Sequence, residues 1–195
     1  MIIYNRIGMP RAKRISDEAA LEGALEVMFR TGPGELTLAA VAAEVGLSPA
    51  TLLQRFGDKQ RLIAKAIAQG NGRFARLVAE APRSAGRDAV LDLFWLLTPD
   101  VEHPAALADQ LLWLGEDFRD PELNALAQAR FRLLRAAVAE RLPPLRVSPE
   151  VGARLLEAQW QGALNQWGFF HEGRLVDYVA RCLTEWFDLV AEDDA

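Results

Sequence analysis

Cysteine and histidine are scarce in this sequence, and their scarcity excludes several kinds of site. The 195 residues contain one cysteine, Cys182, and two histidines. One cysteine excludes an internal disulfide, and two separated histidines provide no cluster of metal ligands. We therefore expect no metal ion and no cofactor.

Long apolar runs are missing as well. Those around residues 91–97 and 110–114 are short and interrupted, well below the roughly 20 residues that cross a bilayer. The amino terminus has no signal-peptide pattern, so we expect a cytoplasmic protein without a membrane segment. Residues 1–10 show no periodicity, and Met9 is an alternative start. Because 51% of the residues are hydrophobic, we expect a globular chain with one large or two small domains.

Common signatures of catalysis are also absent. The sequence has no Ser/His/Asp arrangement and no glycine-rich phosphate loop. The acidic residues Glu116, Asp117, Asp120 and Glu122 suggest acid–base chemistry, but they fall in an expected exposed turn. We interpret them as solvated capping charges and expect no enzyme activity.

Charge is divided unevenly along the chain. The net charge is −5, yet residues 1–76 carry eleven Lys and Arg against seven Asp and Glu, which makes this part +4. Residues 77–195 carry eleven against twenty, which makes them −9. A basic amino-terminal part beside an acidic remainder is suited to contact phosphates through the first part alone.

The segment 37–62 is the most informative part of the chain, because it predicts two short helices joined by a tight turn. Thr37 is a candidate N-cap for the first helix, and Gly46 supplies the left-handed residue that ends it. Ser48 can cap the second helix, whose first turn accommodates Pro49. The apolar face of the first helix consists of Leu38, Val41, Ala42 and Val45.

The second helix combines buried anchors with exposed polar groups. Leu52 and Phe56 are expected to hold it from beneath, which leaves Thr51, Gln54 and Arg55 outward together with the backbone amides at the helix start. A helical hairpin in a core is the alternative, but packing alone does not require hydroxyl, amide and guanidinium groups on one short helix. We therefore predict a DNA-binding helix-turn-helix.

The rest of the chain also has helical periodicity, and no stretch has the alternation of a strand. We predict an all-α fold of about nine helices, with a break at Gly32-Pro33-Gly34. Beyond the two short helices, the expected helices are 15–31, 58–80, 87–97, 104–114, 121–142, 149–171 and 174–191. The expected domains are a DNA-binding unit at 1–57, a connecting helix at 58–83, and a ligand-binding and dimerisation domain at 84–195. Residues 1–14, with Arg11, Lys13 and Arg14, are either an arm that contacts DNA or an ordinary tail.

The first 80 residues resemble the TetR family of bacterial transcriptional regulators. The resemblance rests on Val41-Ala42, Gly46-Leu47-Ser48, Thr51-Leu52, Phe56, Lys59 and Leu62. It implies a three-helix DNA-binding unit that leads into a long fourth helix and a larger helical domain. Two positions depart from the family's pattern, which commonly has an aromatic residue in place of Leu53 and often histidine in place of Arg55.

The expected DNA contacts divide into two groups. Phosphates are assigned to Thr37, to Ser48 with nearby amides, and to Arg55 and Lys59, although Lys59 is alternatively a solvated surface charge. Base reading is assigned to Ala50, Thr51 and Gln54, because glutamine pairs with adenine and small apolar groups touch the thymine methyl. The full predicted set is Thr37, Ser48, Pro49, Ala50, Thr51, Leu53, Gln54, Arg55 and Lys59.

The last two helices have apolar residues around most of their circumference, which indicates burial on two sides. We predict a two-fold dimer through them, with a monomer that has a deep core as the alternative. The predicted interface residues are Leu156, Trp167, Leu175, Val179, Cys182 and Trp186.

The resemblance also implies a small-molecule pocket in the larger domain. The residues assigned to it are Trp95, Gln110, Trp113, Phe131, Gln159 and Trp160, although aromatic residues at helical spacing also serve as plain core. With few fixed charges expected there, an apolar, neutral or cationic effector is favoured. The function implied is a repressor that binds a pseudo-palindromic operator as a homodimer and is released by a small, largely apolar effector. The alternative is a ligand-independent adaptor or activator of the same fold.

Overall fold

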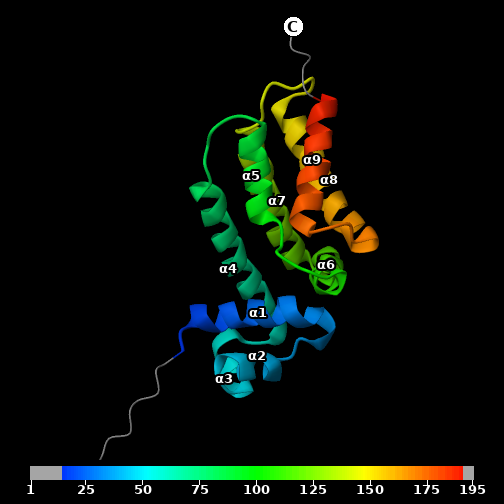
Figure 1. Ribbon diagram of the computed structural model, residues 1–195. Helices are drawn as coiled ribbons and strands as arrows, with labels where there is room; N and C mark the ends of the chain where they lie inside the picture. The colour runs from blue at the N-terminus through cyan, green and yellow to red at the C-terminus, as the bar shows by residue number, and fades with distance from the viewer. Residues whose placement is uncertain (1–14, 191–195) are drawn as a thin grey trace, which may run out of the picture.

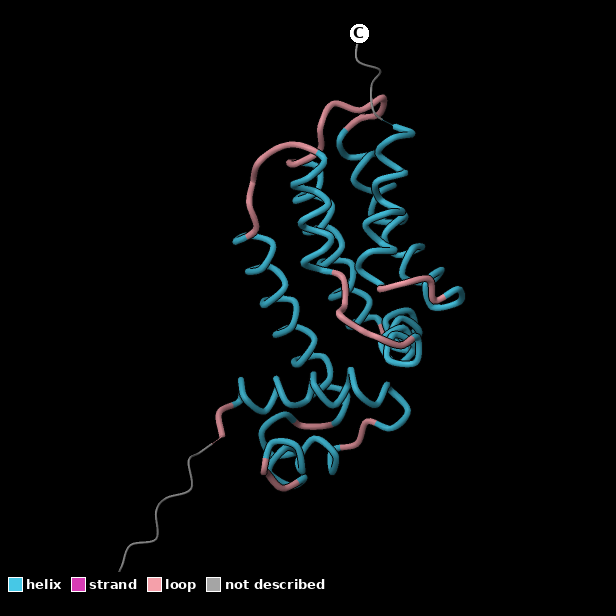
Figure 2. Tube along the Cα trace, in the orientation of Figure 1, coloured by secondary structure: helices cyan, strands magenta, loops and turns pink. Residues whose placement is uncertain are grey.

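The computed structural model describes residues 15–190, apart from the side chains of Asp109 and Gln110. This part of the chain contains nine helices and no strand, which confirms the all-α prediction (Figure 1, Figure 2). None of the helices described is apolar over a length that would cross a membrane. The helices are α1 Asp17–Glu35, α2 Leu38–Val45, α3 Pro49–Phe56, α4 Lys59–Glu80, α5 Arg87–Leu97, α6 Pro104–Arg119, α7 Pro121–Ala139, α8 Pro149–Phe170 and α9 Leu175–Val190.

The amino-terminal helices form a compact unit at one end of the molecule. Helix α1 packs across α2 and the first part of α4, and α3 lies on the outer side of this unit (Figure 1). The predicted break in α1 is confirmed at Gly32, whose φ of 67° and ψ of 177° are not helical. Glycine takes this positive φ without the steric cost that a side chain would add.

Helix α4 connects the two ends of the molecule. It begins beside α3, where the Asp58 carboxylate caps it by accepting a hydrogen bond from the Arg61 amide at 2.8 Å. It then runs for 22 residues toward the carboxy-terminal helices and ends at Glu80 (Figure 1). One continuous helix therefore joins the helix-turn-helix to the rest of the chain.

Helix α6 is longer than its periodicity predicts. It continues to Arg119, through the expected break at 115–119. Helical geometry then places Asp117 one turn after Trp113 on the same buried face. The interpretation of Asp117 as a solvated charge is therefore wrong, whereas Asp120 does cap α7 by accepting from the amides of Glu122 and Leu123.

Two hydrophobic cores stabilise the chain. The amino-terminal core consists of side chains from α1, α2, α3 and α4, and it also includes Trp113 from α6 and Leu123 from α7. The carboxy-terminal core joins the end of α4 to α5, to Leu107 of α6 and to the last three helices, with Phe94, Trp167 and Phe187 as its large buried side chains.

The carboxy-terminal core contradicts part of the prediction for the dimer interface. Leu156, Trp167, Leu175 and Val179 are at most 2% exposed, because they fill the space between α8, α9 and their neighbours within one chain. These four side chains leave no surface for a second copy, so this part of the predicted interface is wrong. Cys182 and Trp186 pack at the edge of the core and are partly exposed.

Candidate nucleic-acid interface and effector cavity

The turn between α2 and α3 has the geometry that its sequence predicts. Gly46 adopts the left-handed conformation, with φ 67° and ψ 33°, and its amide donates to the Ala42 carbonyl. The Leu47 amide donates to the same carbonyl at 2.9 Å. These bonds satisfy the end of α2 and direct the chain at once into α3.

Helix α3 is fixed at its start and from beneath. The Ser48 hydroxyl accepts a hydrogen bond from the Thr51 amide at 3.1 Å and lies 2.8 Å from the Thr51 hydroxyl. Pro49 occupies the first turn, while Leu52 is fully buried and Phe56 nearly so. Eight residues of helix are thereby held in one orientation, with the amino-terminal end at the surface.

The outer face of α3 is free of other protein. Pro49, Ala50, Leu53 and Gln54 are exposed, and Thr51 is partly exposed. A helix start also presents backbone N–H groups and positive dipole charge, which favour phosphate. The exposed face belongs to a single helix, and the major groove of B-DNA is wide enough to admit one α-helix.

Two further predicted contacts lie at the starts of neighbouring helices. Thr37 caps α2 by accepting a hydrogen bond from the Ala40 amide at 3.0 Å, and its side chain is exposed. Lys59 is the first residue of α4 and is exposed, with no salt bridge among those in the described part of the chain. The structure therefore brings hydroxyl, ammonium and amide groups to the surface at three helix starts.

Arg55 differs from the prediction. Its Nε donates to an Asp17 carboxylate oxygen at 2.6 Å, and a terminal nitrogen donates to the Ile15 carbonyl at 2.8 Å. The guanidinium therefore ties α3 to the start of α1 instead of pointing outward. Local spacing does not reveal this pairing, because Asp17 lies 38 residues earlier in the chain. The basic residues Arg11, Lys13 and Arg14 lie outside the described residues.

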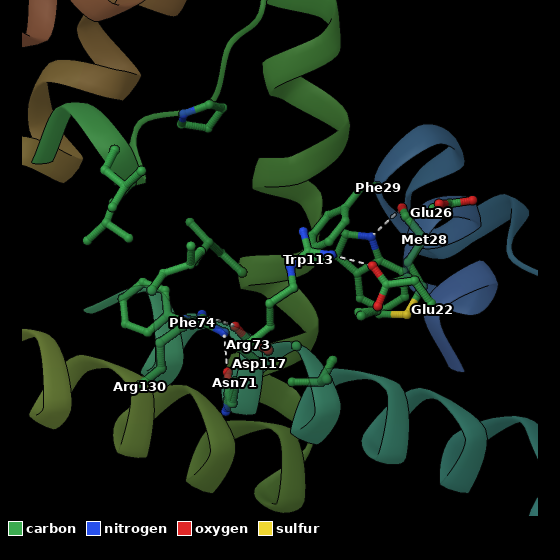
Figure 3. A pocket seen from close by; sticks show the side chains of 18 of the residues that line it. Glu22, Glu26, Met28, Phe29, Asn71, Arg73, Phe74, Trp113, Asp117 and Arg130 are labelled. Atoms are coloured by element: carbon green, nitrogen blue, oxygen red, sulfur yellow. Dashed lines mark hydrogen bonds and ion pairs between the residues drawn. The ribbon is translucent and has the colours of Figure 1, made fainter. Parts of the chain in front are cut away.

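A cavity lies between the amino-terminal unit and the carboxy-terminal helices, beside the contact of α1 with α6. Its larger chamber has a volume of about 510 Å³ and is bordered by α1, α4, α6 and α7, with Phe29, Phe74 and Trp113 among its walls (Figure 3). A smaller chamber of about 200 Å³ lies toward α8. Phe29, Phe74, Leu97, Pro99, Leu114, Arg130 and Trp160 border both chambers.

The predicted pocket residues separate into two groups. Trp113, Phe131 and Trp160 border these chambers, whereas Trp95 is 61% exposed and Gln159 is exposed, and neither borders them. Trp95 and Gln159 are therefore wrong as residues of this cavity. Gln110 lies in α6, but its side chain is outside the described part.

Two tryptophans of the cavity wall use their indole nitrogens in bonds between elements. Trp113 Nε1 donates to the Met28 carbonyl of α1 at 2.8 Å (Figure 3). Trp160 Nε1 donates to the Thr98 hydroxyl at 3.1 Å. Trp113 thus links the wall of the cavity directly to the amino-terminal unit.

The cavity also contains more charge than expected. Arg130 and Asp117 border the larger chamber, and one Arg130 nitrogen lies 3.8 Å from an Asp117 carboxylate oxygen. Burial raises the pKa of Asp117 above its ordinary value, and the attraction of Arg130 only partly opposes this. Burial likewise lowers the pKa of Arg130. The expectation of few fixed charges is wrong, because α6 and α7 bring these two groups together across 13 residues of sequence.

Comparison with known proteins agrees with this geometry. Residues 20–66 match the family model of bacterial regulatory proteins of the tetR family. No curated protein matches the chain in sequence.

Solved structures share the fold over nearly the whole chain. A transcriptional regulator of Rhodococcus sp. Rha1 has a TM-score of 0.73 at 17% identity, over 91% of this chain and 99% of that one. A tetR-family transcriptional regulator of Streptomyces coelicolor has a TM-score of 0.69 at 15% identity, over 89% and 82%. A regulator of Saccharomonospora viridis, solved in complex with choline, has a TM-score of 0.71 at 21% identity, over 90% and 97%.

The matched segment contains all of α2 and α3 and the turn between them. The amino-terminal unit therefore belongs to the TetR family of bacterial regulatory proteins, and the chain as a whole has the fold of TetR-family transcriptional regulators.

Proposed function

We propose that the protein is a cytoplasmic transcriptional repressor that binds a pseudo-palindromic operator as a homodimer and leaves it when a small, largely apolar effector binds. The observation that carries this proposal is α3. Its inner side chains are anchored, its start is capped by Ser48, and Ala50, Leu53 and Gln54 remain exposed on its outer face. Such a helix is suited to lie in the major groove.

The exposed groups support a division of labour on DNA. Thr37, Lys59 and the amides around Ser48 would contact phosphates, which position the helix without reading sequence. Gln54 would read a base edge, and Ala50 with the Thr51 methyl would touch thymine. Leu53, which has no polar group, would add apolar contact beside Pro49.

A dimer would align two such helices with one face of the duplex. On α8 and α9 the side chains left at the surface include Leu155, Phe169 at 86% exposed, and Leu189 at 77%. We assign these residues, together with the partly exposed Cys182 and Trp186, to contact with the partner chain. The half-sites would lie about 34–36 Å apart, one turn of DNA.

The cavity supports control by a ligand. It lies between α1 and the carboxy-terminal helices, so a bound molecule would contact both ends of the protein, and Trp113 already bonds α1 through Met28. A relative of the same fold holds choline. An effector would release DNA only if it bound the DNA-incompetent arrangement more tightly.

The proposal is tested by selecting bound fragments from a random-sequence DNA pool at low ionic strength. We expect retention of pseudo-palindromic sequences, and a Lys59→Ala variant should bind all of them more weakly, with a salt slope lower by about one. Arg154→Ala, an exposed arginine on α8, is the matched control and should leave the slope unchanged. Retention of no fragment contradicts the proposal, and a monomeric mass at micromolar concentration contradicts the dimer.

The ligand-independent adaptor or activator is separated by effector release. Compounds that fill the cavity should dissociate a repressor from its selected fragment. A complex that persists with the cavity occupied favours the adaptor.

A further inference from the structure

Arg130 is unusual among the arginines in the interior because its guanidinium is only weakly used. Its hydrogen bond to the Asn71 amide oxygen is long, at 3.3 Å, and Asp117 at 3.8 Å is beyond hydrogen-bond distance. Buried Arg141, by contrast, donates to four carbonyls. Arg130 therefore has N–H groups available for a further hydrogen-bond acceptor, although most of its side chain is covered.

Arg130 lies where a ligand in the cavity could reach these N–H groups. Arg130 borders both chambers, whereas Asp117 borders only the larger one. The centre of its guanidinium lies 5.3 Å from the centre of the Phe131 ring, in a cation–π contact. The positive charge of Arg130 therefore borders the smaller chamber as well as the larger one.

The smaller chamber is mostly hydrocarbon, and its polar side chains besides Arg130 are the amides Gln161 and Asn165. Its remaining walls include Leu107, Leu111, Phe131, Leu134 and Leu164. An apolar body would fill it, because each side chain on these walls gains by excluding water. A cationic ligand would instead place its charge against Arg130.

From these contacts we infer that the effector is a small apolar acid, with its carboxylate on Arg130 and its hydrocarbon body in the smaller chamber. The inference rests on the proposed regulatory function, because it names the ligand of that regulator. A guanidinium binds a carboxylate through two parallel hydrogen bonds, which Asn71 and Asp117 do not supply. Burial also disfavours the charged form of Asp117, so this carboxyl, 3.8 Å away, balances the charge of Arg130 only in part.

Three compounds with one apolar body test the inference by calorimetry: 4-phenylbutanoate, 4-phenylbutanamide and 4-phenylbutylammonium. The carboxylate should bind at least roughly tenfold more tightly than the amide or the ammonium, since a hydrogen bond to a charged group contributes about that much. Arg130→Met should reduce carboxylate binding to the level of the amide and leave amide binding unchanged. Arg132→Met, an exposed arginine on the same helix, should preserve the order.

Asp117→Asn provides a test that misfolding cannot imitate. Removal of the competing carboxylate should tighten 4-phenylbutanoate binding several-fold. Weaker carboxylate binding in this variant, tightest binding of the ammonium, equal binding of all three compounds, or binding of none would overturn the inference.

The inference and the proposed function fail separately. DNA retention is measured on the same preparation without any compound. If fragments are retained but the expected order of affinities is absent, only the ligand class is wrong. If no fragment is retained, the regulatory proposal fails, whatever the compounds do.

Discussion

Replacing Arg141 tests how the long helix α4 is held at its far end. Arg141 is 2% exposed and lies just after α7. Its Nε donates to the Pro82 carbonyl at 2.8 Å, and a terminal nitrogen donates to the Ala137 carbonyl at 2.7 Å. Weaker bonds of 3.2 and 3.4 Å reach the carbonyls of Ala81 and Val78. The guanidinium therefore caps the end of α4, where carbonyls lack helical partners.

The expected loss follows from these bonds. The two short ones, at about 1.5–3 kcal/mol each for a charged donor, give roughly 3–6 kcal/mol. Part of this is offset because the Arg141→Met variant no longer buries a charge. We expect a net loss of about 3 kcal/mol, which in a chain of this size lowers the melting temperature by roughly 6–12 °C.

The assay is thermal unfolding followed by circular dichroism at one fixed protein concentration. Arg141→Lys retains the charge but not the planar fork, so its loss should be intermediate. Arg154→Met, on the surface of α8, should shift the midpoint by less than about 2 °C, as ordinary surface changes do. The reasoning is refuted if Arg141→Met shifts the midpoint no more than Arg154→Met does.

Three other substitutions test contacts between distant segments. Trp113→Phe removes the donor to the Met28 carbonyl and should lower the free energy of unfolding by about 1–3 kcal/mol in urea titrations; no loss would mean that this bond contributes nothing. Asp117→Asn should gain stability relative to the wild type as pH rises above about 3.8, because burial raises the pKa of Asp117 and its ionisation in the folded wild type therefore costs stability. A difference in stability between the two proteins that stays constant from pH 4 to 7 would contradict this. Asp17→Asn should free Arg55 to reach phosphate and raise the salt slope of DNA binding by about one, and an unchanged slope would keep Arg55 off the DNA.

The helix-turn-helix was predictable from sequence because its determinants are local. Ser48 caps an amide three residues away, and Gly46 ends a helix by its own backbone conformation. Signals of this kind act over one helical turn, so spacing alone reveals them. For the same reason the break at Gly32 was predictable from glycine beside proline.

Contacts between distant segments were not predictable. Arg55 is outward by helical spacing, yet the fold brings Asp17 to it from the start of α1. Periodicity also marks Leu156 and Val179 as apolar but does not say which protein surface covers them, and the chain's own core does so. The placement of Arg130 beside Asp117 at the cavity depends on how α6 and α7 pack, which sequence spacing does not specify.

Photocross-linking from α3 tests most directly whether this helix enters the major groove. Gln54 is replaced by the photoreactive residue p-benzoylphenylalanine and the protein is irradiated with its selected DNA fragment; the same replacement at exposed Gln159 on α8 is the control. We predict cross-links from position 54 to bases within each half-site and none from position 159. Equal cross-linking from both positions, or none from position 54 while the fragment stays bound, would contradict the assignment of α3 as the helix that reads DNA.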